Sequence, residues 1–322
     1  MTSELTLHIK KAQLFPIAIT MIISTALTII AIISGEVYQE AVLFPEAIGG
    51  ATFGLFNALF YLSFGIIGGF IIFLIIKYGK MKLLRAILFI CFLVLTTMII
   101  IFYGYFLTVI FNIRYSDIPL TIISIVLGVL ITYQLFSENA SDRRKNISLL
   151  IIGGALGSFL AIWLPSWTAF LMLALFSIWD IYAVKKGPIK QIIELNQKDE
   201  ESYLKQLSFG SAEWEIGLGD LVFYTMLTSH ILYNCRVPYT YFSFLMNYGI
   251  VISLVPFFVS ILGVFIGVKI TFKLLEKRKM LPGLPISIGL GILFFLLSLL
   301  LILLFFKPTS FLIFPPIQIK LL

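Results

Sequence analysis

The sequence predicts an all-α polytopic membrane protein with about nine transmembrane helices, and three observations lead to this fold class. Of the 322 residues, 60% are hydrophobic and only 12% are charged, against about 25% charged in an ordinary soluble domain. The mean hydropathy is +1.06. The basic residues behind the net charge of +7 occur in short clusters between apolar runs, which is typical of membrane topology and not of a nucleic-acid-binding face.

Nine apolar segments are long enough to cross a bilayer. A spanning helix needs about 20 residues, because the hydrocarbon core is about 30 Å thick and a helix rises about 1.5 Å per residue. The first segment follows Lys10 and Lys11 as a signal peptide would, but its apolar run is longer and lacks an Ala-x-Ala site, so we expect an uncleaved helix. The predicted spans are 13–34, 52–76, 84–111, 118–136, 147–164, 167–184, 216–234, 241–272 and 285–306.

The distribution of lysine and arginine predicts the orientation of these helices. With the N-terminus inside and the C-terminus outside, nineteen of the 23 basic residues lie on the inner side, as the positive-inside rule requires. The first outer loop then carries only acidic charges, at Glu36, Glu40 and Glu46.

We expect one structural domain in three parts. Residues 1–184 form an N-terminal six-helix bundle, 185–215 a cytosolic linker, and 216–322 a C-terminal part with three helices. The linker is polar and too short for a folded domain, which predicts an amphipathic or mobile segment. Cys91 and Cys235 have no paired spacing, so we expect neither a disulfide nor a metal site.

Two acidic residues lie inside predicted spans, where an aspartate costs at least ~2.5 kcal/mol. Asp180 precedes the inner end of the sixth helix by five residues, and Asp220 follows the inner start of the seventh by five. Each is therefore roughly 7–8 Å below the inner boundary. Either alone could reach the interface or pair with a lysine. Two at matched depth on consecutive antiparallel helices, with no basic residue in the spans to neutralise them, predict a functional pair.

Two carboxyl groups that share one proton can act as general base and general acid on a water and a carbonyl, without a metal or a covalent intermediate. The surrounding sequence fits such a site. The run Gly217–Asp220 reads GLGD, and its glycines leave space where backbone or substrate must come close. The segment Leu281–Pro285 reads LPGLP, whose prolines oppose helix formation. Non-helical backbone at membrane depth is tolerated only inside protein or along a wet cavity.

Three sequence blocks carry a resemblance to a known family. They are WDIYAV at 179–184 followed by KGP, GLGD at 217–220 followed by FY, and LPGLPISI at 281–288. In order and spacing they resemble the motifs of the presenilin and signal peptide peptidase family of intramembrane aspartyl proteases, and the chain is most similar to archaeal presenilin homologues. The resemblance is sharp over 176–194, 216–227 and 280–291, and only architectural before residue 165.

This resemblance implies that the pair catalyses peptide hydrolysis within a transmembrane helix of a substrate protein, near its inner end. It implies no cofactor, no nucleic acid, a multi-pass location in the cell membrane of an archaeon, and activity without accessory subunits. Catalytic roles would fall to Asp180 and Asp220, and substrate-binding roles to Gly217, Leu218, Gly219, Pro282, Gly283 and Leu284.

The chain departs from the family pattern in three places. Trp179 replaces the usual tyrosine, Gly283 replaces the usual alanine, and the linker lacks the hydrophobic insertion that presenilins cleave in themselves. We therefore expect an enzyme that works uncut.

Other interpretations stay open on the residues alone. An ion-coupled secondary transporter also uses membrane aspartates and proline-broken helices, although it usually shows an inverted repeat and a midplane site. A non-catalytic channel or chaperone could keep the same fold. His230 is interpreted as a structural residue, not a catalytic base.

Overall fold

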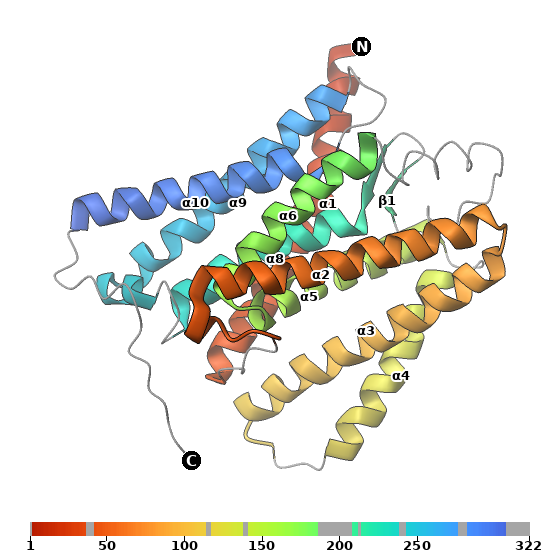
Figure 1. Cartoon of the computed structure of the whole chain (residues 1–322), viewed down its shortest axis with the longest axis horizontal. Coiled ribbons are helices and arrows are strands. Elements are labelled where there is room, and N and C mark those ends of the chain that lie inside the picture. Colours follow the sequence, from red (N-terminus) through yellow and green to blue (C-terminus); the bar gives the residue numbers. More distant parts are fainter. Residues whose placement is uncertain are drawn as a thin grey trace.

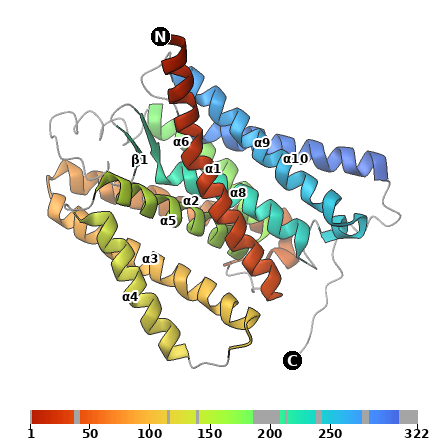
Figure 2. The same cartoon turned by 180° about the vertical axis from the view of Figure 1, so that it is seen from behind.

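The computed structural model describes residues 2–36, 42–113, 117–137, 141–185, 208–211, 214–237, 243–275 and 282–306. Within them the chain forms nine α-helices, one 3-10 helix and a two-stranded sheet (Figures 1 and 2). The helices are α1 (Thr2–Ser34), α2 (Glu46–Lys77), α3 (Met81–Ile110), α4 (Asp117–Phe136), α5 (Asp142–Trp163), α6 (Ser166–Lys185), α8 (Leu218–Arg236), α9 (Ile250–Leu275) and α10 (Leu284–Phe306).

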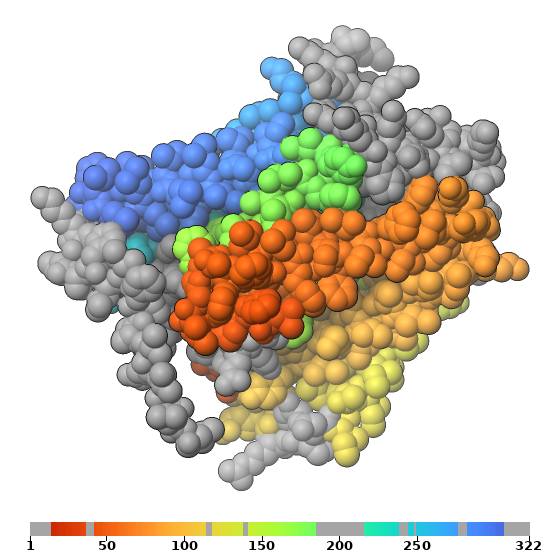
Figure 3. Space-filling model, viewed as in Figure 1, coloured from red at the N-terminus to blue at the C-terminus, as the bar shows by residue number. Residues whose placement is uncertain are grey.

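The predicted fold class is confirmed. Eight of these helices are long and apolar enough to cross a membrane, and α8 is the exception. Fourteen of its 19 residues are buried, because α8 packs against α1, α5, α6, α9 and α10. In the space-filling view α10, α6 and α2 cover one face, and almost nothing of α8 is visible there (Figure 3). A helix surrounded by protein does not need the apolar surface that lipid demands, which explains its polar composition.

The contact between α5 and α8 places α8 at the centre of the bundle. A Cβ on Gly157 would overlap the Thr225 hydroxyl and lie 2.7 Å from the Val222 carbonyl oxygen. The Thr225 hydroxyl in turn lies 3.3 Å from the Gly153 carbonyl oxygen. Small residues at this crossing let the two backbones approach closely, as in many membrane helix pairs.

The eighth predicted membrane segment begins later than its hydropathy suggests. The predicted span 241–272 is wrong at its start, because α9 begins only at Ile250. Before it, Ser243–Tyr248 form the 3-10 helix η2, and Gly249 has a φ of +92° that separates the two elements. An apolar sequence continues through this break, so hydropathy alone does not mark it.

The end of the linker is also more ordered than predicted. Residues 186–207 lie outside the described part of the chain, but β1 (Ser208–Ser211) and β2 (Trp214–Gly217) form an antiparallel pair. Ser208 pairs with Gly217, and Gly217 is also the N-cap residue of α8. The hairpin therefore leads directly into the helix that carries Asp220.

Glu46, which the sequence placed in a loop, is a buried carboxylate in the described part of the chain. It is the first residue of α2 and only 2% exposed. Its Oε2 accepts the Trp167 N–H at 3.0 Å, and its Oε1 accepts the Thr168 N–H at 2.5 Å and the Thr168 hydroxyl at 2.6 Å. These N–H groups belong to the first turn of α6, where they have no partner within the helix. Glu46 thus joins α2 to the end of α6 opposite Asp180.

Candidate active site

The end of α6 and the start of α8 lie beside the hairpin at one end of the bundle (Figure 1). Asp180 is on the last turns of α6 and Asp220 is the third residue of α8. Both are half-buried, and both lie against the backbone at Gly283 and Leu284. The structure therefore brings together the two carboxylates that the sequence analysis paired.

Asp180 faces the N-terminus of α10. Its Oδ2 accepts the backbone N–H of Leu284 at 3.2 Å, and the N–H of Gly283 also interacts with this carboxylate. Leu284 is the first residue of α10, so its N–H has no acceptor within the helix and belongs to the positive end of the helix dipole. Asp180 is oriented by contacts from another element of the site.

Asp220 lies against the same segment, Pro282–Leu284. A Cβ on Gly283 would lie 2.6 Å from Oδ2 of Asp220 and 3.0 Å from its Cγ. Real Cβ atoms are essentially never that close to another heavy atom, so this position has space for glycine only while Asp220 stays in place. The segment is non-helical only at Pro282 and Gly283, because Leu284 and Pro285 already begin α10. The predicted non-helical stretch is thus shorter than expected, and Leu281 lies outside the described residues.

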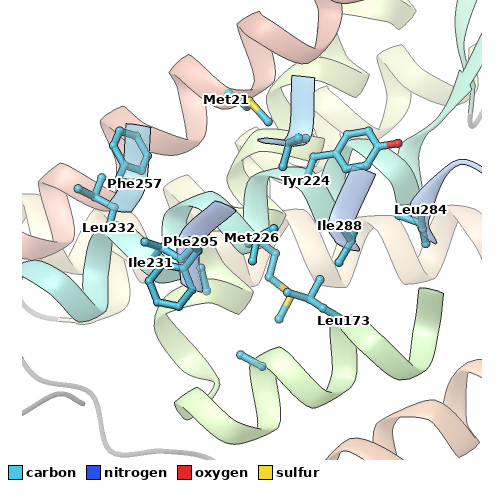
Figure 4. Packing of buried hydrophobic residues seen from close by; sticks show 14 of the residues in the cluster. Met21, Leu173, Tyr224, Met226, Ile231, Leu232, Phe257, Leu284, Ile288 and Phe295 are labelled. Atoms are coloured by element: carbon cyan, nitrogen blue, oxygen red, sulfur yellow. The ribbon is translucent and has the colours of Figure 1, made fainter. Parts of the chain in front are cut away.

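Two hydroxyl groups that the prediction did not assign complete the described site. The Tyr224 hydroxyl donates to the Gly283 carbonyl oxygen at 3.1 Å, and the Ser287 hydroxyl donates to the same oxygen at 3.2 Å. In Figure 4 the ring of Tyr224 extends from α8 toward the start of α10, where Leu284 and Ile288 lie. The spacing could have indicated Tyr224, because it lies four residues after Asp220 and therefore on the same face of the helix.

The remaining predicted residues differ in how they meet the site. Gly217 and Gly219 are both exposed, and neither has a positive φ. A Cβ on Gly219 would meet no described atom. The Leu218 side chain packs against the hydrophobic cluster that includes Leu149 and Ile152, and its Cδ1 would lie 3.2 Å from a Cβ on Gly153 of α5. The Leu284 side chain is buried in the main core, so only its backbone N–H reaches the carboxylates.

Two further residues behave as structural ones. His230 is buried, with Nδ1 2.7 Å from the Ala161 carbonyl oxygen and Nε2 3.0 Å from the Asn234 amide nitrogen. Both ring nitrogens are therefore partnered, as a structural histidine requires. Trp179 packs its ring on Tyr182, with centroids 5.3 Å apart. Across the described residues, no three His, Cys, Asp or Glu side chains cluster as metal ligands would.

The fold and the site define a helical, multi-pass membrane protein with a carboxylate pair near one face of the bundle. The sequence model of the presenilin family matches residues 7–216, more than half of the chain. The chain therefore belongs to the presenilin family. The matched range includes Asp180 and ends before Asp220. The family match therefore does not cover Asp220 or the Pro282–Leu284 segment, and their position beside Asp180 comes from the structure.

Relatives support this membership. Presenilin-B from Dictyostelium discoideum is 32% identical over 142 residues, which is 42% of this chain and 26% of that protein. The match thus spans about a quarter of the relative's length. Two solved structures of a presenilin family intramembrane aspartate protease share the fold, with TM-scores of 0.57 and 0.56 at 13% and 16% identity. They align over 88% and 89% of this chain and 96% and 99% of theirs.

Proposed function

We propose that this protein is an intramembrane aspartyl endopeptidase that hydrolyses peptide bonds within transmembrane helices of substrate proteins. The observation that carries the proposal is the placement of Asp180 and Asp220 against the same backbone segment, Pro282–Leu284. Family membership and the shared fold support the same activity.

The proposed chemistry uses one ionised and one protonated carboxyl group. The ionised group accepts a proton from water as the water oxygen attacks the substrate carbonyl carbon, and the protonated group donates its proton to the carbonyl oxygen. In the resulting tetrahedral intermediate the C–N bond breaks as the nitrogen takes up a proton. The products are a carboxylic acid and an amine, and the pair again holds one proton.

The substrate must be extended before water can reach a bond that a helical turn shields. We propose that the exposed Gly217 and Gly219 leave room for this extended segment. The Gly283 carbonyl and the Leu284 N–H already have partners within the protein, so these two groups contribute to the site by orienting it. The partners we propose are a transmembrane helix and the bilayer of an archaeal cell, with no accessory subunit.

Cleavage of a fluorogenic transmembrane peptide by the purified full-length protein in detergent tests the proposal. We expect cleavage by the wild type and its loss in both Asp180→Ala and Asp220→Ala. Asp142→Ala is the control, because Asp142 is an exposed carboxylate at the start of α5. Unchanged cleavage in either site variant would rule out the paired mechanism. Gradient-driven uptake by proteoliposomes without peptide products would indicate a transporter instead.

A further inference from the structure

One peptide group of the site is held at both ends. The Gly283 carbonyl oxygen accepts hydrogen bonds from Tyr224 and Ser287, and the Leu284 N–H of the same peptide group donates to Asp180. Because a peptide group is planar and rigid, its oxygen and its N–H turn together. The direction in which the N–H points at Asp180 is therefore set by what holds the oxygen.

The two hydroxyl contacts are not equivalent. Ser287 lies four residues after Gly283, and a hydroxyl that bonds back to the i−4 carbonyl is a common local contact in membrane helices. Tyr224 reaches Gly283 from another helix, across 59 positions in the sequence. It is also buried, so its hydroxyl needs hydrogen-bond partners within the protein, and the Gly283 carbonyl and Ser287 supply them.

Tyr224 also connects the second aspartate to the same peptide group. It lies one helical turn after Asp220 on α8, and the Asp220 carboxylate interacts electrostatically with it. The hydroxyl contact thus sets how close the start of α10 lies to the face of α8 that carries Asp220. Gly283, which approaches Asp220 closely, belongs to the peptide group that Tyr224 holds.

We propose that Tyr224, assisted by Ser287, is a positioning residue that orients the Gly283–Leu284 peptide group toward the aspartates. Its effect on turnover rests on the proposed function, whereas the restraint of the peptide group does not. Removing either hydroxyl lets the peptide plane turn, which weakens the hydrogen bond to Asp180 and widens the range of separations between the carboxylates.

Kinetics of matched variants in the full-length protein test the role in turnover. We expect Tyr224→Phe to lower kcat on a transmembrane peptide about tenfold, the effect of about one hydrogen bond, with KM changed less than about twofold. Ser287→Ala should have a smaller effect. The double variant should lose less than the product of the two, because both hydroxyls act on one oxygen. Tyr233→Phe and Ser298→Ala remove buried hydroxyls from the same helices away from the site and serve as controls.

Hydrogen exchange of the backbone amides at 284–288 gives a measurement that needs no activity. We expect faster exchange there in Tyr224→Phe than in the wild type or Tyr233→Phe, with the other helices unchanged. Unchanged exchange at the start of α10 would overturn the inference, whatever the kinetics show. If the wild type cleaves no peptide but the exchange rises in Tyr224→Phe alone, the positioning role stands and the proposed function falls.

Discussion

At the scale of single residues, the site depends on the small residue Gly283 as much as on the two charged aspartates. Asp180 and Asp220 approach the same short segment from two helices, Asp180 at the Leu284 N–H and Asp220 at Gly283. Gly283 allows this because it has no side chain to place against Asp220. The identity of this residue therefore bears on how the carboxylates can be arranged.

We predict that Gly283→Ala lowers the proposed proteolytic turnover about tenfold, because the new Cβ would lie 2.6 Å from Oδ2 of Asp220 and the carboxylate or the segment must move. Steady-state cleavage of a transmembrane peptide measures the effect. Gly289→Ala on the same helix is the control, since a Cβ there would meet no described atom. Wild-type turnover in Gly283→Ala would mean that Asp220 or the segment shifts without consequence. Such a result would agree with the family pattern, which usually has alanine at the position of Gly283.

Sequence reasoning found the residues of the site whose signal is local. Asp180 and Asp220 are identified by being charged within apolar spans, and the glycines by their place beside Asp220. The contacts of Tyr224 and Glu46 join residues 59 and 121 positions apart, so no local pattern shows their partners. Leu218 belongs to the local GLGD motif, but the motif does not show where its side chain packs. Only the structure places that side chain against α5.

At the scale of elements, length and hydropathy predicted where helices exist but not how their ends are held. The hairpin before α8 consists of two strands of four residues each, too short for a periodic pattern, and such a pair is marginal unless it packs against other structure. The start of α2 at Glu46 also differs from the predicted start at residue 52, because a kink interrupts the first turns of the helix. Gly50 has a φ of +53° within this helix, so the first turn bends, and the preceding Glu46 contacts α6 instead of extending into a loop.

We predict that Glu46→Ala destabilises the protein by about 1–3 kcal/mol, because it leaves two N–H groups and a hydroxyl at the start of α6 without their acceptor. Glu46→Gln should lose less, since an amide oxygen still accepts hydrogen bonds. Thermal unfolding of the purified protein in detergent measures both. Glu36→Ala provides the comparison in the same outer region. Equal Tm values for Glu46→Ala and Glu36→Ala would show that this carboxylate does not anchor α6.

At the scale of the whole molecule, one arrangement explains both the composition and the site. The apolar helices enclose α8, which can then carry an aspartate, a histidine and several hydroxyls at membrane depth. The charges at the helix ends follow a second rule, because the turn between α2 and α3 and the helix ends beside it are basic at Lys77, Lys80 and Lys82. Together these features predict on which side of the membrane the aspartates lie.

We predict that the turn at Lys80 faces the cytosol, whereas the turn at Asn112 between α3 and α4 faces outside, which places both aspartates near the inner face. Single-cysteine variants Lys80→Cys and Asn112→Cys, made after replacing Cys91 and Cys235, test this because both positions are exposed. A membrane-impermeant maleimide applied to intact cells should label Asn112→Cys, and should label Lys80→Cys only after the membrane is opened. The opposite pattern would invert the topology. Peptide substrates would then be cut near their outer end, since the end of α6 and the start of α8 lie at the same end of the bundle as the turn between α2 and α3 (Figure 1).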